Sequence, residues 1–268
     1  MRWPKFLRRS ATKAGPLVVS FSGGMGAQII SAGIYFSKRQ AGEPVYADFS
    51  YFEVPESVAT VGTPGDCSHW GWQLTPFGLL PEAFEVAPQA LLAQANLLHD
   101  GPHKMELGLD ALAQPLVQRH FALPEAGAIL PPAFLDGYLC IHIRRGDYVN
   151  VASHLVPDAE FVRIAAKFAG LTPHVAVLSD SPISPALQAS VSTYYQGAVF
   201  LDNTDAFTAH RIMRSARILV CYNSQFSLIA AMLNAKALVV IPRQWFDGND
   251  RAIEVPLHAR CTFQILSF

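Results

Sequence analysis

Apolar and polar residues alternate between two kinds of segment along most of the chain. Short apolar runs bounded by Gly, Pro, Ser or Asp predict buried strands, and longer amphipathic stretches predict helices. The predicted strands are 17–21, 45–49, 138–143, 175–178, 198–201, 218–221 and 237–241, and the predicted helices are 28–39, 89–98, 158–168, 204–215 and 224–233. Strands that alternate with helices form parallel sheets, so the pattern predicts an α/β protein.

In two of the predicted helices the pattern of apolar residues also predicts how the helix packs. In 158–168 the apolar residues Phe161, Ile164, Ala165 and Phe168 recur at helical spacing on one face, which should cover a sheet. The segment 224–233 is apolar almost all round, which predicts a buried helix whose polar start faces a crevice.

The chain divides into two halves around a stretch that has little periodicity. Residues 53–136 contain many prolines, and their only clear helical pattern is 89–98. The two βαβ halves on either side predict two Rossmann-like, doubly wound domains that face a cleft, with domains at 1–131 and 132–268.

The composition narrows the function classes. With 51% hydrophobic and 15% charged residues the chain is not of the disordered class, and a net charge of −1 leaves no cationic excess for a nucleic acid. An anionic ligand must therefore be held by a few placed arginines. The cysteines are scattered singly, Cys140 and Cys221 within apolar runs, which predicts reduced thiols of a cytosolic protein and no zinc site.

The N-terminus departs from the even charge. Residues 1–13 carry five basic and no acidic side chains, interleaved with Trp3, Phe6 and Leu7. The segment could rest on an anionic membrane surface as a peripheral contact, or be a solvated tail, and we favour the tail. No run approaches the ~20 apolar residues of a bilayer span, and no signal-peptide core is present, so we expect a soluble or peripheral protein.

Candidate chemistry lies where strands end, because ligands of parallel α/β sheets bind beyond the carboxyl ends of the strands. The strand 138–143 runs directly into Arg144-Arg145-Gly146-Asp147. Alternation along an extended segment predicts that His142 and Arg144 point one way and Arg145 the other. One guanidinium can fork onto diphosphate oxygens, while the other pairs with Asp147 or braces the loop.

Two further strand ends carry polar residues. After 218–221, Asn223 or Ser224 should cap the next helix, whose free N–H groups and positive dipole end would form an anion site. After 175–178, Asp180 could accept N–H donors from a purine, bind a ribose hydroxyl, or cap the following helix.

Together these segments resemble the glycosyltransferase family of GT-B fold that contains the α-1,2-fucosyltransferases. The matching segments are His142 to Tyr148 (His-x-Arg-Arg-Gly-Asp-Tyr), Ser179-Asp180-Ser181, Asn223-Ser224-Gln225-Phe226-Ser227 and Gly23-Gly24-Met25-Gly26-Ala27-Gln28. The chain departs from the family at Ala27 (usually Asn), Ser181 (usually acidic) and Leu228-Ile229 (usually aromatic). These departures leave the acceptor and the linkage open.

The resemblance implies an inverting, metal-independent transfer of L-fucose from GDP-fucose to a glycan hydroxyl, for which the 2-hydroxyl of galactose is our first choice. Arg144 would hold the diphosphate, Asp180 would lie near the guanine, and the donor site would be lined by His142, Asn223, Ser224, Gln225 and Phe226. Charge neutralisation at the departing diphosphate should be the largest catalytic contribution. Asp147 is our candidate general base, with His154 as the alternative.

The acceptor, a galactose-containing oligosaccharide, would bind to the N-terminal domain. Trp70, Trp72 and His69 are candidate sugar-facing residues, although buried core aromatics are the interpretation we favour. Similarity to the bacterial members implies a cytoplasmic protein, at most peripheral to the inner membrane.

Other functions stay open. A nicotinamide-dependent oxidoreductase would use the glycine-rich turn that begins at Gly24, with Asp48 as the ribose acid, although Ile29 stands where the third glycine is expected. A glycosyltransferase of different linkage or donor, and a non-catalytic sugar-nucleotide or glycan-binding module, are the remaining alternatives.

Overall fold

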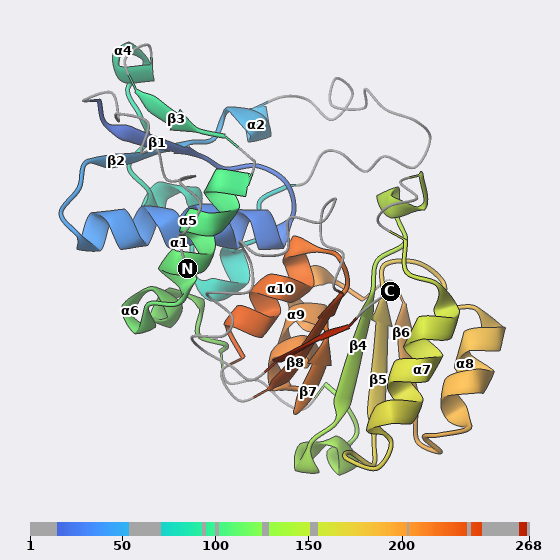
Figure 1. Ribbon diagram of the computed structural model, residues 1–268. Helices are drawn as coiled ribbons and strands as arrows, with labels where there is room; N and C mark the ends of the chain where they lie inside the picture. Colours follow the sequence, from blue (N-terminus) through green and yellow to red (C-terminus); the bar gives the residue numbers. More distant parts are fainter. Residues whose placement is uncertain are drawn as a thin grey trace, which may run out of the picture.

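A computed structural model describes residues 15–53, 71–92, 95–99, 102–124, 129–150, 155–202, 204–234, 237–242 and 263–266. Within these ranges the strands form two sheets, a three-stranded one of order β2-β1-β3 and a six-stranded one of order β6-β5-β4-β7-β8-β9 (Figure 1). Every strand pair is parallel, which confirms the predicted α/β class.

The N-terminal unit is built on the smaller sheet. Its elements are β1 (Leu17–Ser20), α1 (Met25–Gln40), β2 (Val45–Asp48), α2 (Ser50–Glu53), α4 (Gln89–Leu92), β3 (Asn96–Leu98), α5 (Pro102–Leu112) and α6 (Pro115–Gln118), with 3-10 turns η1 (Thr75–Phe77), η2 (Pro81–Ala83), η3 (Arg119–Phe121) and η4 (Pro132–Asp136). Helix α1 begins three residues before the predicted start, because Gly24 adopts an extended conformation as its N-cap.

The predicted helix 89–98 is wrong. Helix α4 ends at Leu92, and Asn96–Leu98 forms strand β3 instead. Asn96 pairs with Leu17 and Leu98 with Val19, so these residues complete the far edge of the sheet and bury Leu98. Tertiary pairing with a distant strand overrides the local helical pattern here.

The elements of the C-terminal unit include all the predicted ones in their predicted order, together with helix α8 (Pro185–Ser192) and strand β9 (Phe263–Leu266), which the sequence pattern did not predict. In chain order the elements are β4 (Leu139–Ile143), η5 (Asp147–Asn150), α7 (Asp158–Phe168), β5 (Val175–Ser179), α8, β6 (Val199–Asp202), α9 (Ala206–Ser215), β7 (Ile218–Val220), α10 (Gln225–Met232), β8 (Leu238–Pro242) and β9. This strand order is that of a doubly wound sheet, in which the chain changes direction between β4 and β7. A crevice therefore opens beyond the carboxyl ends of these two strands.

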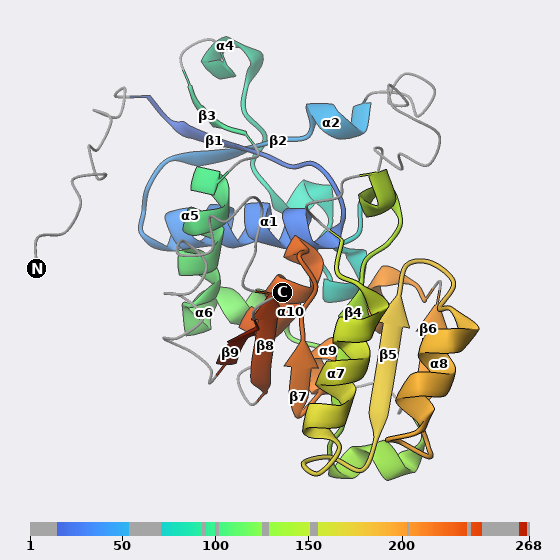
Figure 2. The same cartoon turned by 45° about the vertical axis from the view of Figure 1, so that its right-hand side comes forward.

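Two apolar clusters hold the layers together. One lies between the large sheet and helices α7 and α8, and it buries Phe161, Phe168 and the other predicted apolar positions of α7. The second joins the two units, since it contains residues of α1 and α5 as well as of α9 and α10. Figure 2 shows α10 directly beside α1, below the small sheet. The two units thus share one continuous core.

Several predictions can be placed in this fold. Helix α10 is buried as expected, and Cys140 and Cys221 are buried free thiols. Cys67, Cys261 and the basic residues 1–13 lie outside the described residues. Over the described ranges, no helix has the length and hydropathy needed to span a bilayer.

Candidate functional site

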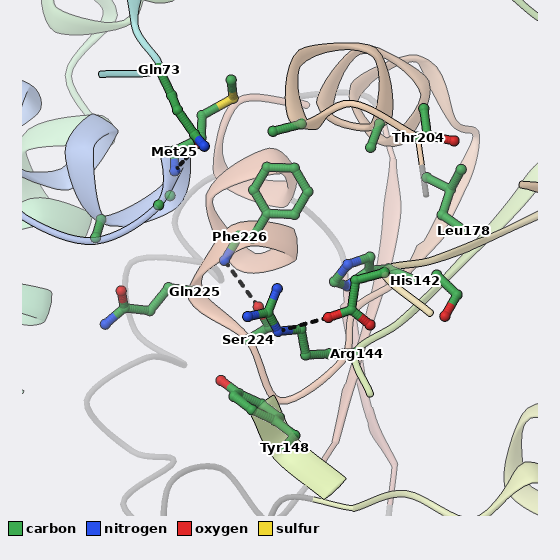
Figure 3. A pocket seen from close by; sticks show the side chains of 17 residues that line it. Met25, Gln73, His142, Arg144, Tyr148, Leu178, Thr204, Ser224, Gln225 and Phe226 are labelled. Atoms are coloured by element: carbon green, nitrogen blue, oxygen red, sulfur yellow. Dashed lines mark hydrogen bonds and ion pairs between the residues drawn. The ribbon is translucent and has the colours of Figure 1, made fainter. Parts of the chain in front are cut away.

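A pocket of about 410 Å³ lies between the two units at the β4/β7 crevice. It is lined by the carboxyl ends of β4 and β5 and the residues after them, by Gln73, and by the N-terminal ends of α1, α9 and α10 (Figure 3). The glycine-rich turn before α1 and the arginine motif after β4 therefore line the same pocket.

Strand β4 presents its polar residues on opposite faces of the sheet. His142 and Arg144 line the pocket. Arg145 lies on the other face, where its Nη1 donates to the carbonyl oxygen of Val156 at 2.8 Å and its Nη2 pairs with Asp158 Oδ1 at 2.5 Å. Arg145 therefore braces the loop before α7, and its carboxylate partner is Asp158 at the start of that helix.

Arg144 is clamped at the rim of the pocket. Its Nε lies 3.1 Å from Asp180 Oδ2, and its guanidinium carbon lies 5.5 Å from the centre of the Tyr148 ring. Figure 3 shows the guanidinium directed toward the start of α10, where Ser224 lies. About a fifth of the side chain (20%) is exposed, so the charge is accessible from the pocket.

Asp180 has a role that neither sequence interpretation included. Its Oδ1 accepts hydrogen bonds from the backbone N–H groups of Arg145 and Gly146, at 2.7 and 3.2 Å. The alternative that it caps the next helix is wrong, because Ser184 caps α8 by accepting from the N–H of Leu187. The predicted position near a guanine base stays a prediction.

His142 is a neutral imidazole. Only 4% of the residue is exposed, and burial together with the nearby Arg144 charge lowers its pKa to about 3. Its Nδ1 is buried and has no hydrogen-bond partner among the described residues, and its ring lies 5.7 Å from that of Phe226. At neutral pH this ring can donate one hydrogen bond and accept one.

Of the three helices that begin at the pocket, α1 and α10 lie beside Arg144. Ser224 caps α10 by accepting from the N–H of Phe226 at 3.3 Å, so of the two predicted caps Ser224 is the one used, while Asn223 is buried beside it. Helix α1 has only Gly24 as N-cap, and the N–H of its first residue, Met25, donates to Gln73 Oε1 at 2.7 Å. The positive ends of both helices and the Arg144 charge therefore face one cavity, which favours an anion.

Sequence reasoning missed two sets of pocket residues. Thr204, before α9, follows the carboxyl end of β6, and the strand-end rule that selected Arg144 applies to it equally. Gln73 reaches the pocket through Gln28, whose Oε1 accepts from the Gln73 N–H at 2.8 Å and whose Nε2 donates to the carbonyl oxygens of Gly23 and Gly71. The local sequence does not predict the pairing of Gln28 with Gln73, because the two residues are more than forty positions apart.

The structure describes only some of the residues that were predicted to face the acceptor or to act as the general base. His69, Trp70, His154 and the side chain of Asp147 lie outside what the structure describes. Trp72 belongs to the core: its indole N–H donates to the carbonyl oxygen of Leu79 at 2.9 Å, and its ring packs on Phe21 and Phe49. The favoured interpretation of Trp72 as a core aromatic is therefore confirmed.

The glycine-rich turn is explained without a dinucleotide. A Cβ on Gly26 would lie 2.9 Å from backbone atoms of Phe226, so glycine is needed for the contact between α1 and α10. Asp48, the candidate ribose acid, uses its Oδ1 to accept from the N–H of Ser50. Both features serve packing and capping within this fold.

Comparison with known proteins finds similarity at the level of structure. No family model and no curated protein matches the sequence, so the family resemblance stays a prediction. Among solved structures, the chain is similar to the E. coli heptosyltransferase WaaC with ADP (10% identity, 94% of this chain and 93% of that chain, TM-score 0.47). It is also similar to POFUT1 in complex with GDP-fucose (14%, 85% and 96%, 0.45) and to a glycosyl transferase of family 9 from Veillonella parvula (9%, 96% and 86%, 0.43).

Proposed function

We propose that this protein is an inverting glycosyltransferase that binds GDP-fucose between its two units and transfers fucose to a glycan hydroxyl. The observation that carries the proposal is the convergence of the Arg144 guanidinium with the N-terminal ends of α1 and α10 on one pocket. A diphosphate is the group such a site suits, because a guanidinium and helix N–H groups both complement phosphate oxygens. The family resemblance of the same residues supports GDP-fucose as the donor.

The proposed reaction separates charge at the diphosphate. The bond between the anomeric carbon and the β-phosphate oxygen breaks, and its electron pair leaves with GDP. An acceptor hydroxyl oxygen, in our proposal the 2-hydroxyl of a galactose, bonds to that carbon from the opposite face and passes its proton to a base, for which Asp147 remains our candidate. Arg144 and the helix ends stabilise the charge that grows on the leaving group, which accelerates the bond-breaking step.

The other predicted donor residues fit around this centre. His142, neutral near pH 7, can donate one hydrogen bond to a phosphate or sugar oxygen without adding charge. Ser224, Gln225 and Phe226 form the first turn of α10 at the pocket, and Asn223 precedes them. We propose that this turn holds the diphosphate and that the ring of Phe226 bounds the site on the side of His142.

The test is a thermal-shift screen of the purified protein with GDP, GDP-fucose, GDP-mannose, ADP, UDP and NAD. A ligand at 100 times its dissociation constant stabilises by about 2.7 kcal/mol, which raises the melting temperature of a 268-residue chain by about 5 °C. We expect GDP and GDP-fucose to stabilise the wild type and to have no effect on Arg144→Ala. Arg39→Ala, which breaks a surface pair with Glu85, is the matched control and should respond as the wild type does.

Turnover completes the test. Incubation with GDP-fucose and a panel of galactosides should release GDP and yield a fucosylated product. Stabilisation by ADP or UDP alone would mean that the donor is not GDP-fucose but a sugar linked to that nucleotide. Stabilisation by NAD alone would overturn the glycosyltransferase proposal. Binding of GDP-fucose without turnover on any acceptor would favour a non-catalytic binding module.

A further inference from the structure

Asp180 stands beside Arg144 because of strand register. Strands β4 and β5 are parallel, and Ile143 pairs with Ser179 in the last step of the ladder. The next residue of each strand is Arg144 on one side and Asp180 on the other. The ladder thus brings a cation and a carboxylate together at the rim of the pocket.

Both oxygens of this carboxylate are engaged. Oδ1 accepts from the N–H groups of Arg145 and Gly146, and Oδ2 pairs with Nε of Arg144 at 3.1 Å. Ser181 adds a further bond from its Oγ to Oδ1 at 3.4 Å. One side chain therefore fixes both the turn after β4 and the guanidinium that the turn carries.

The turn is packed so tightly against this carboxylate that it leaves no room for a side chain. A Cβ on Gly146 would lie 2.7 Å from Asp180 Oδ2, so a larger residue there would have to displace the carboxylate from Arg144. On its other side, the Arg144 guanidinium faces the ring of Tyr148. Arg144 is thus held between the Asp180 carboxylate and the Tyr148 ring. These two contacts restrict a long, flexible side chain to one orientation.

We infer that Asp180 is a positioning residue, which aims Arg144 at the leaving diphosphate and does not itself bind the nucleotide. The inference rests on the proposed function for the identity of the ligand, but the pair itself is a property of the protein alone. Pairing through Nε fixes the guanidinium plane close to the aliphatic stem of the side chain, and the guanidinium is directed toward the start of α10 at the pocket. A misdirected guanidinium costs most in the transition state, where charge on the diphosphate is greatest.

Asp180→Asn tests separately the two functions of Asp180, which are to hold the turn after β4 and to orient Arg144. The amide keeps an oxygen for the N–H groups of Arg145 and Gly146, but it places an NH₂ donor against the Nε–H of Arg144. In binding GDP two effects oppose each other, since removal of a negative charge favours the anion while loss of orientation disfavours it. We therefore expect turnover to fall by at least about tenfold, whereas the dissociation constant of GDP changes by less than about threefold.

The experiment measures turnover, GDP affinity and the Nε–H signal of Arg144 in ¹⁵N-labelled protein, assigned by its loss in Arg144→Lys. Asp180→Asn should lose or broaden that signal, whereas Glu160→Gln, the same charge change in the surface pair with Arg163, should keep it together with wild-type turnover. Gly146→Ala, whose Cβ would displace Asp180 Oδ2, should reduce turnover in the same way while Asp180 itself is kept.

Three results would overturn the inference: wild-type turnover in Asp180→Asn, an unchanged Arg144 signal, or a loss of GDP affinity that parallels the loss of turnover. The last would mean that Asp180 contacts the nucleotide directly. If the wild type neither binds GDP nor transfers fucose, the proposed function fails, and the Nε–H signal still decides whether Asp180 positions Arg144.

Discussion

Gly26 of α1 lies against the backbone of Phe226 of α10, so closely that a Cβ on Gly26 would stand 2.9 Å from both the amide nitrogen and the Cα of Phe226. The contact joins the N-terminal ends of two helices from different units, directly at the pocket. Because the opposing atoms belong to the backbone, no rotamer change relieves the overlap. The distance between the two helix ends, and hence the width of the anion site, is set at this point.

Gly26→Ala should therefore destabilise the protein and weaken GDP binding. The alanine gains up to ~1 kcal/mol in helix propensity, but forcing the helices apart costs about 1–3 kcal/mol, so we expect a net loss in the free energy of unfolding. Denaturant titration measures it. Gly170→Ala, at an exposed position with nothing within 4 Å of the new Cβ, is the control, and equal stability of the two variants would contradict the packing argument.

Ser224→Ala and Ser184→Ala form a matched pair of cap variants. Each serine accepts from a backbone N–H of its own helix, and each replacement should lower stability by about 1 kcal/mol. Of these two helices α10 begins at the pocket and α8 does not, so only Ser224→Ala should also weaken GDP binding, by about fivefold. Calorimetric titration distinguishes them, and equal affinities would exclude the α10 turn from the site.

Gln28→Met tests the connection between the glycine-rich turn and the segment that carries Gln73. The Gln28 side chain is fully buried and makes three hydrogen bonds to backbone groups of Gly23, Gly71 and Gln73. Methionine fills the volume but leaves those groups unsatisfied, which should cost about 2–3 kcal/mol. Gln188→Met, which removes one partly buried bond to Ile183, should cost less than half of that.

The stability of the protein should fall on acidification below about pH 6.5. Burial, and the nearby Arg144 charge, lower the pKa of His142 to about 3, and burial with Arg214 lowers the pKa of His210 well below its usual value. Between the folded and unfolded pKa values the unfolded chain binds more protons, so the free energy of unfolding decreases as pH falls, by up to ~1.4 kcal/mol per pH unit for each histidine.

His210→Leu should remove one of these contributions. His210 is fully buried, and neither of its ring nitrogens has a hydrogen-bond partner in the described part of the chain, so leucine should also keep or raise stability at pH 7. The slope of stability against pH between 4 and 6 should decrease by about one proton. An unchanged slope in His210→Leu would contradict this assignment.

The sequence by itself determined the local structure around the site. Alternation in β4 placed His142 and Arg144 on one face and Arg145 on the other, and the helical period of 158–168 identified the buried face of α7. Both follow from the fixed geometry of strands and helices, in which spacing along the chain dictates direction in space. The strand-end rule likewise predicts that Arg144, Asp180 and Ser224 lie at one crevice, and all three line the pocket.

Only the tertiary structure decided what those residues contact. Asp180 meets Arg144 through the register of β4 and β5, Arg145 meets Asp158 through the packing of α7, and Gln73 enters the site through Gln28. Residues 96–98 became a strand because β1 offers them an edge. Each of these contacts joins residues far apart in the chain, and their partners depend on how whole elements pack, which local periodicity does not encode.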